Sequence, residues 1–384
     1  MGRFRDALAG PGLAAIAEFK RRSPSAGDIR PLAEPAKLAG TYEAAGAAAM
    51  SVLVDERFAG SWDDLRAARA AARLPLLAKG FFSTADDLRI AREAGADAVL
   101  LLLRDLDDGA AGRLMAAAAE LDLDALVEAH DADELERAVR LGADPIGVNA
   151  RNLSTFAVDR LAQLDLVARA PRNRIVIAES GIHSRAQGAA AELAGANAML
   201  VGTALMRARD PGAKLRELLS RPLVKVCGLT REEDVAVAAE AGADLLGFIL
   251  AHESPRRADA VLDVPETTLA VAVFVGETRP TAAHLTQLYE LDGGHRSREA
   301  LLLRADEPVA RVLDLPWEQD DPEHWRRAAG AEGRIVLAGR LGPDNVREAI
   351  ERVQPWAVDA SSRLERDPGV KDHDAVRAFV AAAR

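Results

Sequence analysis

The chain has 384 residues, a formal net charge of −11 and a pI near 5.3. This length exceeds the roughly 250–300 residues at which one hydrophobic core stops growing, so two domains are expected. The acidic balance argues against a nucleic-acid partner, since a phosphate backbone binds a dense basic surface. The apolar runs fall short of the ~20 residues of a membrane span, and no apolar leader precedes residue 10. We therefore expect a cytoplasmic protein with no membrane partner.

Short apolar runs alternate with alanine-rich stretches along the first half of the chain. Because the runs are apolar throughout, they are typical of parallel strands that helices cover on both faces. Eight strands are predicted, at residues 13–19, 50–54, 74–78, 98–103, 125–129, 146–149, 175–178 and 199–202. A helix at residues 211–219 follows them. Eight such units close a barrel within about 200–250 residues.

An internal repeat extends this pattern into the second half. EAGADAVLLLL at residues 93–103 is echoed by EAGADLLGFIL at residues 240–250. In both copies the glycine falls where a helix would end in a left-handed residue, just before the next strand. Further strands are predicted at residues 223–226, 245–250, 269–275, 300–303, 311–313, 335–338 and 357–359, with a weak one at 287–291.

The expected fold is therefore α/β, with two tandem (β/α)8 TIM barrels in domains 1–220 and 221–384. The second half is short for such a barrel, and residues 278–314 leave too little room for full βα units. We expect the second barrel to be trimmed there.

In such barrels the active site lies at the carboxyl ends of the strands, where polar residues become candidates for chemistry. The first half supplies Glu18, Lys20, Lys79, Glu128, Asn149, Arg151, Glu179 and Ser180. Lysines that face carboxylates can exchange protons near neutral pH without a metal. Small residues after strands seven and eight would let backbone amides approach a phosphate; they are Gly181, Gly202 and Thr203. No His pair, Walker loop or dinucleotide fingerprint occurs, so neither metal nor cofactor is expected.

These segments resemble indole-3-glycerol phosphate synthase. The similarity lies in AEFKRRSPS (17–25), LAKGF (77–81), GVNARNL (147–153), AESGI (178–182) and VGTALM (201–206). It implies decarboxylating ring closure of 1-(2-carboxyphenylamino)-1-deoxyribulose 5-phosphate. The resemblance makes Lys79 the general acid at the ketone and Glu128 the proton donor or acceptor of the dehydration. It assigns the flanks of the site to Glu18 and Lys20, substrate positioning to Asn149, Glu179 and Ser180, substrate binding to Arg151 and Ser23, and phosphate to Gly181, Gly202 and Thr203.

The second half resembles phosphoribosylanthranilate isomerase. The similarity lies in VKVCGLT (224–230), GFIL (247–250), ESPRR (253–257), LAG (337–339), VDASS (358–362) and PGVKD (368–372). It implies an Amadori isomerisation of N-(5-phosphoribosyl)anthranilate that yields the substrate of the first reaction. The implied roles are base for Cys227, acid for Asp314, anthranilate carboxylate binding for Arg256, and substrate binding for Gly339, Asp359, Ser361 and Ser362.

Two of these residues also stand out by position. Cys227 ends a predicted strand, where backbone amides or nearby Lys225 would favour its thiolate. As the only cysteine, it can form neither an intrachain disulfide nor a thiolate cluster. Asp314 also follows a strand, although an ordinary helix cap would look the same.

The sequence departs from both family patterns at several places. Arg340 and Arg363 stand where glycines are expected beside the isomerase phosphate. The His-Gly-x-Glu segment is not recognisable at residues 289–295, and residues 316–319 replace a glycine-rich loop. Only 17 residues precede Glu18, fewer than the helical extension of the synthase family.

Three alternatives follow from these observations. The second barrel could be a catalytically impaired structural partner of an active synthase. The chain could also be another phosphate-handling barrel, such as a sugar-phosphate isomerase, or a binding module without catalysis. On the leading interpretation the partners are small phosphorylated substrates, and the chain is a monomer.

Overall fold

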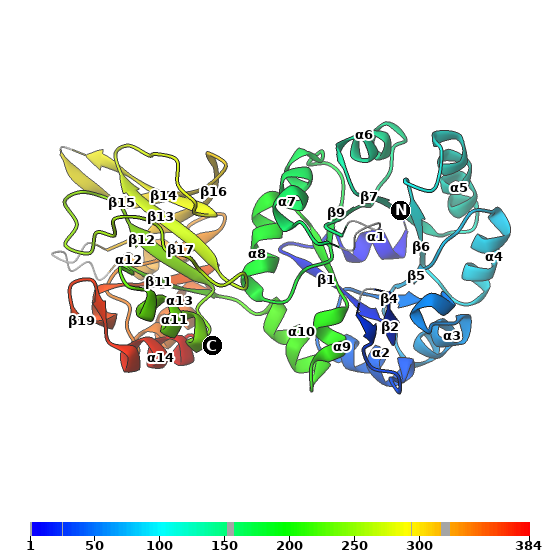
Figure 1. The fold of residues 1–384 in the computed structure, drawn as a ribbon, viewed down its shortest axis with the longest axis horizontal. Helices are drawn as coiled ribbons and strands as arrows, with labels where there is room; N and C mark the ends of the chain where they lie inside the picture. Colours follow the sequence, from blue (N-terminus) through cyan, green and yellow to red (C-terminus); the bar gives the residue numbers. More distant parts are fainter. Residues whose placement is uncertain (1, 25, 152–156, 293, 316–322) are drawn as a thin grey trace. The chain divides into compact units, whose positions relative to one another are not determined.

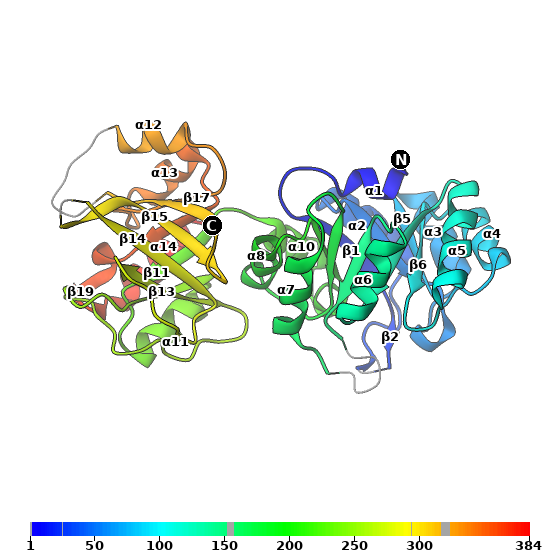
Figure 2. The ribbon, with the colours of Figure 1, turned by 90° about the horizontal axis from the view of Figure 1, so that it is seen from above.

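The computed structural model describes residues 2–24, 26–151, 157–292, 294–315 and 323–384. The chain divides into two compact units, residues 1–183 with 188–219, and residues 184–187 with 220–384. Each unit is built around a closed eight-stranded barrel (Figures 1 and 2). The prediction of two tandem barrels is confirmed.

All neighbouring strands of the first barrel are parallel, in the order of the chain. The strands are β1 (Ala14–Phe19), β4 (Ala49–Leu53), β5 (Leu76–Lys79), β6 (Ala98–Leu102), β7 (Asp124–Ala129), β8 (Ile146–Asn149), β9 (Val176–Glu179) and β10 (Ala198–Val201). The helices are α1 (Arg3–Ala7), α2 (Pro35–Ala44), α3 (Trp62–Ala71), α4 (Ala85–Glu93), α5 (Asp108–Glu120), α6 (Ala132–Arg140), α7 (Arg160–Arg169), α8 (Arg185–Ala194), α9 (Thr203–Arg207) and α10 (Pro211–Leu219). A 3-10 turn η1 (Glu56–Phe58) and a small ribbon of β2 (Arg22–Ser23) and β3 (Gly27–Asp28) lie in the loops.

Local sequence signals fix where the outer helices begin and end. Ser61 and Thr84 each form a capping box at the start of α3 and α4, which satisfies backbone amides that a helix leaves unpaired. The two repeat glycines, Gly95 and Gly242, have φ of 99°, as the repeat predicts for left-handed helix ends.

Helix α1 closes the amino-terminal end of the first barrel. Its Phe4, with the following Leu8, is fully buried in one apolar cluster with Ile16 and Leu77. Asp124, at the start of β7, accepts hydrogen bonds from two backbone amides of this helix. Burial of two such side chains contributes about 1.5–3 kcal/mol each. The helix therefore stabilises the end of the barrel opposite the expected active site.

The second barrel has eight strands but is not parallel throughout. The strands are β11 (Leu223–Cys227), β12 (Leu245–Ile249), β13 (Leu269–Val275), β14 (Leu285–Asp292), β15 (His295–Arg304), β16 (Glu307–Leu313), β17 (Ile335–Leu337) and β18 (Ala357–Ala360). The helices are α11 (Glu232–Ala241), α12 (His324–Ala329), α13 (Val346–Val353) and α14 (His373–Ala382), with a 3-10 turn η2 (Ser362–Leu364) and a ribbon of β19 (Glu365–Asp367) and β20 (Val370–Lys371).

The expectation of parallel βα units is wrong for the middle of this barrel. Strand β15 pairs antiparallel with both β14 and β16, and the described residues between β12 and β16 contain no helix. Ala305 and Asp306 have φ of 47° and 63°, the two left-handed residues of a tight hairpin turn. The weakly predicted strand at 287–291 is real and longer than expected. Hairpins in place of helices explain how eight strands fit into so short a segment.

The reversed strand has a consequence for the active site. In a parallel barrel only carboxyl ends of strands reach the catalytic mouth. Because β15 runs the other way, its amino end, with His295 and Arg296, joins the residues that line the cavity at this mouth.

In the described part of the chain, no helix combines the length and apolar character that crossing a bilayer demands.

Candidate active sites

The first barrel has a cavity of about 530 Å³ at the carboxyl ends of its strands. It is lined by nearly all the residues that the sequence singles out, namely Glu18, Lys20, Ser23, Lys79, Glu128, Asn149, Arg151, Ser180, Gly181, Gly202 and Thr203. Glu179 is fully buried and does not line the cavity, but it contacts Lys79. The structure therefore brings the whole predicted set to one place.

Lys79 lies at the centre of this set, among three buried carboxylates from three other strands. Its Nζ is 2.6 Å from Glu179 Oε2, 3.6 Å from Glu18 Oε2 and 3.8 Å from Glu128 Oε2. Burial alone would lower the pKa of Lys79, but the charges of Glu179, Glu18 and Glu128 outweigh it and raise the pKa. The side chain is therefore a cationic hydrogen-bond donor that faces the cavity.

The pKa values of two carboxyl groups around Lys79, those of Glu179 and Glu128, are shifted in opposite directions. Burial, with the charge of Glu128, raises the pKa of Glu179 to about 8, despite Lys79. Burial also acts to raise the pKa of Glu128, but His130 and Lys79 outweigh it and lower the value to about 2. Such a divergence is typical of acid and base pairs in active sites. Glu128 Oε2 and Glu179 Oε1 are buried without a hydrogen-bond partner in the described residues, and Glu128, which lines the cavity, is the one that a bound substrate can reach.

Lys20 and Glu18 form a second ion pair in the lining of the same cavity, with 2.6 Å between Nζ and Oε1. Burial acts to raise the pKa of Glu18, but Lys20 and Lys79 outweigh it and lower the pKa. A Cβ at Gly202 would lie 2.2 Å from Glu18 Oε1 and 2.9 Å from Lys20 Nζ. The glycine at the end of β10 is therefore required by this pair as well as being suited to an anion.

The side of the cavity expected to bind phosphate combines open backbone with positive charge. Ser180 and Gly181 both have φ of 70°, and no side chain caps the helix that begins after Gly202. Two further residues of this cavity, His183 and Arg207, were not predicted. Burial and then the surrounding cations lower the pKa of His183. The other site residues were predicted because they lie at or next to the end of a strand. His183 and Arg207 lie several residues beyond β9 and β10.

His130 is a third residue of this site that the sequence did not reveal. Its Nε2 lies 3.1 Å from Glu128 Oε1, and its Nδ1 lies 3.0 Å from Glu134 Oε2. Burial acts to lower the pKa of His130, but these two carboxylates outweigh it and raise the pKa to about 10. Asn149 Nδ2 donates to the same Glu128 oxygen at 3.1 Å. Glu128 is thus held on one edge, and its other oxygen remains for a ligand.

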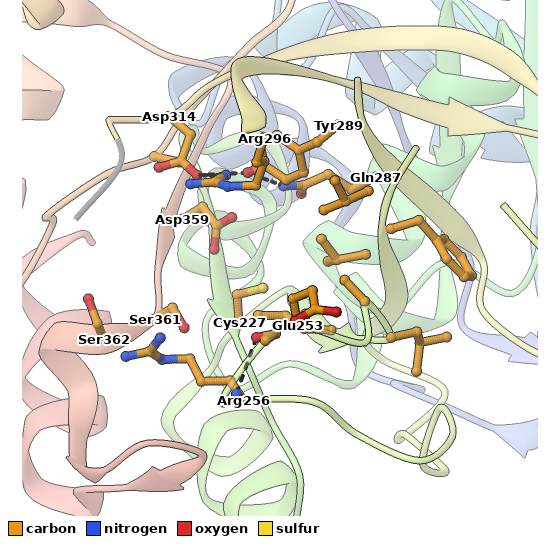
Figure 3. A pocket seen from close by; sticks show the side chains of 18 of the residues that line it. Cys227, Glu253, Arg256, Gln287, Tyr289, Arg296, Asp314, Asp359, Ser361 and Ser362 are labelled. Carbon is orange, nitrogen blue, oxygen red and sulfur yellow. Dashed lines mark hydrogen bonds and ion pairs between the residues drawn. The ribbon is translucent and has the colours of Figure 1, made fainter. Parts of the chain in front are cut away.

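The second barrel has a cavity of about 910 Å³, shown from close by in Figure 3. It is lined by all seven predicted isomerase residues, Cys227, Arg256, Asp314, Gly339, Asp359, Ser361 and Ser362. Figure 3 shows Cys227 and Arg256 on one side, with Asp314 across the cavity from them. Across both barrels, no group of three or more His, Cys, Asp or Glu side chains among the described residues could hold a metal ion.

The expectation of a favoured Cys227 thiolate is wrong for this cavity. Burial raises the pKa of the thiol, although the charges of Lys225 and Lys371 act to lower it. Besides acting on the thiol, Lys225 donates to Asp359 Oδ2 at 2.6 Å and to Gln287 Oε1 at 2.9 Å. The Lys225 ammonium, which is near Cys227 in the sequence, is therefore shared with Asp359 and Gln287.

Arg256 is anchored by a carboxylate that the sequence did not single out. Its Nε donates to Glu365 Oε2 at 2.7 Å, and Glu365 Oε1 accepts from the buried Lys371 at 2.7 Å. A Cβ at Gly228 would lie 2.7 Å from Ser361 Oγ and 3.2 Å from Arg256 Cδ. Ser361 Oγ is buried without a hydrogen-bond partner in the described residues. The Ser361 hydroxyl and the Arg256 side chain thus lie together beside Gly228, where a larger residue would crowd them.

The two arginines in place of glycines behave differently. Arg340 lines the cavity and adopts φ of 57°, so the backbone keeps the left-handed conformation that a glycine would have. Arg363 instead donates to Asp344 Oδ2 at 2.9 Å and to the Arg340 carbonyl at 3.2 Å. Gly339 is required sterically, since a Cβ there would lie 2.2 Å from Leu315 N. The departure at residues 316–319 lies outside the described residues.

Asp314 Oδ2 accepts two hydrogen bonds, from the Tyr289 hydroxyl at 2.8 Å and from Arg296 Nη1 at 2.6 Å. Neither donor was predicted. Tyr289 lies in the segment where the family motif is not recognisable, and Arg296 begins the strand whose direction the sequence did not reveal.

Comparisons with known proteins show which families the two barrels are similar to. Residues 2–218 match the family "Indole-3-glycerol phosphate synthase", and residues 318–382 match "N-(5'phosphoribosyl)anthranilate (PRA) isomerase". The "Tryptophan biosynthesis protein TrpCF" of Yersinia pestis is 36% identical over 417 residues, which cover 99% of this chain and 87% of that protein. The "Indole-3-glycerol phosphate synthase" of a Nocardioides species is 48% identical over 219 residues, which cover 57% of this chain and 83% of that protein.

Among solved structures, the phosphoribosyl anthranilate isomerase from Thermotoga maritima is similar to 42% of this chain and 98% of its own, with 25% identity and a TM-score of 0.33. The assignment depends on the two family matches and on the relative that spans both barrels. The chain therefore belongs to the TrpCF family of tryptophan-biosynthesis proteins, in which an indole-3-glycerol phosphate synthase barrel is joined to a phosphoribosylanthranilate isomerase barrel.

Proposed function

We propose that the chain catalyses two successive steps of tryptophan biosynthesis at two separate cavities. The first barrel forms indole-3-glycerol phosphate from 1-(2-carboxyphenylamino)-1-deoxyribulose 5-phosphate. The second barrel makes that substrate from N-(5-phosphoribosyl)anthranilate. The observation that carries the first assignment is Lys79, held among Glu18, Glu128 and Glu179 beside an open phosphate loop.

In the synthase reaction, the ring carbon that bears the carboxylate attacks the ketone carbon, and a carbon–carbon bond forms. Lys79 donates a proton to the ketone oxygen as that oxygen gains the electron pair. The carboxylate leaves as carbon dioxide, and its electron pair restores the aromatic ring. In the dehydration, Glu128 takes the proton from the neighbouring carbon and passes it to the hydroxyl, which leaves as water, while the electron pair of the broken C–H bond forms the ring double bond. Asn149 fixes Glu128 for this step through Oε1, and Glu128 Oε2, which has no hydrogen-bond partner in the described residues, is the oxygen assigned to the proton.

Substrate positioning follows from the rest of the first cavity. We assign Ser180 to the alignment of the substrate, with Lys20 and Glu18 beside it and Arg151 and Ser23 at the mouth; Glu179 acts on the substrate through Lys79, which it contacts. The phosphate binds the backbone of Gly181, Gly202 and Thr203, and no side chain caps the helix that follows Gly202. The positive surroundings of His183 support an anion at this end.

In the isomerase reaction, Asp314 donates a proton to the ribose ring oxygen while the bond from that oxygen to C1 breaks. The electron pair of the bond goes to the oxygen, and the nitrogen lone pair forms a C=N bond. Cys227, as thiolate, then takes the proton from C2, which gives an enolamine that tautomerises to the ketone. Arg256 pairs with the anthranilate carboxylate through its guanidinium fork.

The remaining isomerase residues bind the substrate. Gly339, Ser361 and Ser362 provide its phosphate end, and Asp359 contacts it through Oδ1, which is buried without a hydrogen-bond partner in the described residues. The alternative of an impaired second barrel is less well supported, because Cys227, Asp314 and Arg256 line one cavity and Arg340 keeps the backbone course of a glycine.

We also propose domain limits at 1–220 and 221–384, a monomeric state and a cytoplasmic location. A monomer is supported because each barrel gathers its proposed site residues from its own strands and loops. The cytoplasm is supported because a biosynthetic intermediate that carries a phosphate does not cross membranes freely.

The test is to assay each half-reaction separately on the purified chain. Lys79→Ala should lower indole glycerol phosphate formation by roughly 10²–10⁴-fold, the usual contribution of a general acid, and leave isomerisation unchanged. Cys227→Ser should do the reverse. Lys37→Ala, on the exposed face of α2, is the matched control. Parallel loss of both rates in folded Lys79→Ala protein would contradict separate sites.

A further inference from the structure

A directed chain of hydrogen bonds runs across the floor of the second barrel to Asp314. Lys225 Nζ donates to Gln287 Oε1 at 2.9 Å, Gln287 Nε2 donates to the Tyr289 hydroxyl at 2.8 Å, and that hydroxyl donates to Asp314 Oδ2 at 2.8 Å. An ammonium can only donate, so the carbonyl of Gln287 must face it. The amide must then donate to Tyr289, and the tyrosine proton must point at Asp314.

The first donor of this chain, Lys225, and its last donor, Tyr289, keep their protons. Burial acts to lower the pKa of Lys225, but Asp359 outweighs it and raises the value, so the side chain stays an ammonium. Burial, and then the charge of Asp314, raise the pKa of Tyr289 well above its ordinary value. The tyrosine is therefore a lasting donor, and each bond of the chain polarises the next toward Asp314.

Arg296 provides a second donor to the same oxygen. Its Nη1 lies 2.6 Å from Asp314 Oδ2, and its guanidinium lies over the Tyr289 ring, 4.3 Å from the centroid. Figure 3 shows the two side chains together at Asp314, with Gln287 behind them. Both donors use Oδ2, and among the described residues no hydrogen bond to Oδ1 is found. The two oxygens of this carboxyl group are therefore in different environments.

The topology of the barrel explains why an arginine reaches this point. Strand β15 is antiparallel to β14, and the register shifts between Tyr289 and Leu291. In a regular strand Arg296 and Arg298 would share a face. Here Arg296 lines the catalytic cavity, whereas Arg298 lines a separate one with Glu299 and Arg311. The irregular register therefore turns one arginine of this strand inward.

We propose that Tyr289 and Arg296 are positioning residues of the isomerase reaction: they hold Asp314 Oδ2, so that Oδ1 carries the proton delivered to the ribose ring oxygen. The inference rests on the proposed role of Asp314 as the acid. When Oδ1 gives up its proton and the C1–oxygen bond breaks, negative charge develops on the carboxylate. Two donors already aimed at it stabilise that charge without rearrangement.

The experiment measures isomerase kcat and KM for Tyr289→Phe, Arg296→Gln, Arg296→Lys and Asp314→Asn. Loss of one preorganised donor should lower kcat by roughly 10–100-fold, with KM within about twofold of the parent. Arg296→Lys should recover part of the loss, since it keeps a cationic donor. Arg298→Gln, the same change two residues along the strand, should leave both constants unchanged.

The outcomes separate this inference from the proposed function. In the Asp314→Asn background, Arg296→Gln should cause no further loss, because it acts through that carboxyl group. Unchanged kcat in folded Tyr289→Phe, which removes only a hydroxyl, would overturn the inference while Asp314 remains the acid. A loss confined to KM would also overturn it, since it would show substrate binding instead. Full isomerase activity of Asp314→Asn would contradict the proposed function itself.

Discussion

Lys79 and Glu179, from β5 and β9, are joined at 2.6 Å between Nζ and Oε2 inside the first barrel. Two more carboxylates, Glu18 and Glu128, lie within 4 Å of the same ammonium. Glu18 and Glu128 each have a second cationic partner, Lys20 and His130, whereas Glu179 is paired with Lys79, so the third carboxyl group of the cluster tends to keep its proton. Glu179, the carboxyl whose pKa is raised to about 8, is that group.

This arrangement predicts a pH limit on the synthase that depends on Glu179. Below pH 8 the carboxyl is mostly protonated and leaves Lys79 available to the ketone; above it, the carboxylate holds the ammonium more strongly. We expect kcat/KM for ring closure to fall as the pH rises through about 8. Glu179→Gln, which mimics the protonated form, should lose this limb but keep activity near pH 7.

The measurement is a pH–rate profile of the parent chain and of Glu179→Gln between about pH 6 and pH 9.5. Glu93→Gln, on the exposed end of α4, is the control and should retain the parental limb. A limb that stays in place in Glu179→Gln would assign the titration to another group of the cluster.

His130 should stabilise the first barrel in a pH-dependent way. Its pKa in the folded chain is raised to about 10, so its contribution is fully present below about pH 6.5, the ordinary value in an unfolded chain. The contribution is lost as the pH rises through about 10. We expect the urea midpoint to fall between pH 7 and pH 10, and His130→Asn to show a smaller fall. The synthase kcat of His130→Asn should drop several-fold, because Glu128 Oε1 loses its contact with the imidazole and keeps only the hydrogen bond from Asn149.

His183 offers the matched control for that stability measurement. Burial lowers its pKa, so its neutral form is favoured in the fold and its contribution is lost on acidification instead. His183→Asn should therefore keep the parental fall in the urea midpoint between pH 7 and pH 10. An equal fall in parent and His130→Asn would show that the imidazolium does not stabilise the fold.

The sequence was sufficient for the first site because each of its main residues directly follows an apolar run. Lys79 and Asn149 are the last residues of β5 and β8, so a search of strand ends found them. His130 is the first residue after β7, as Lys20 is after β1, so a search of strand ends also reaches it; what the sequence does not reveal is that its ring lies between Glu128 and Glu134. A three-dimensional contact of this kind leaves no periodic signal.

The second barrel was harder to predict for a different physical reason. The β15–β16 turn has Ala305 and Asp306 at positions where Asn-Gly is the usual hairpin signal. Without that signal the strands look like members of parallel units, and the amino end of β15 is not searched for site residues. Arg296 was missed for this reason, and also because the strand predicted at 300–303 begins earlier, at His295.

Cys227 should give the isomerase an alkaline dependence. The base must be a thiolate, and burial raises the pKa of this thiol above its ordinary range near 8.5. We therefore expect isomerase kcat/KM to increase with pH through 7–9 rather than level off near neutrality. The synthase rate of the same chain, measured in the same buffers, controls for general effects of pH on the protein. A plateau already reached at pH 7 would mean that the substrate or another group lowers the pKa of the thiol in the complex.

Arg340→Gly should move stability and substrate affinity of the second barrel in opposite directions. The arginine has φ of 57°, a left-handed conformation that costs a side-chain-bearing residue about 1–2 kcal/mol and a glycine almost nothing. After the larger unfolded-state entropy of glycine is subtracted, we expect a gain of about 0.5–1 kcal/mol in the free energy of unfolding. Because Arg340 lines the cavity, loss of its charge should raise isomerase KM several-fold.

Gln354→Gly is the matched control for this last prediction. Gln354 has φ of 51° at the end of α13 and is exposed, outside the residues that line the cavity. It should show a similar gain in stability with no change in KM. If Arg340→Gly raises stability but leaves KM unchanged, the arginine takes no part in binding the anionic substrate, and the family's glycine has been replaced without functional gain. If it lowers stability, contacts of the side chain outweigh the backbone strain, and the residue is a structural adaptation of this barrel.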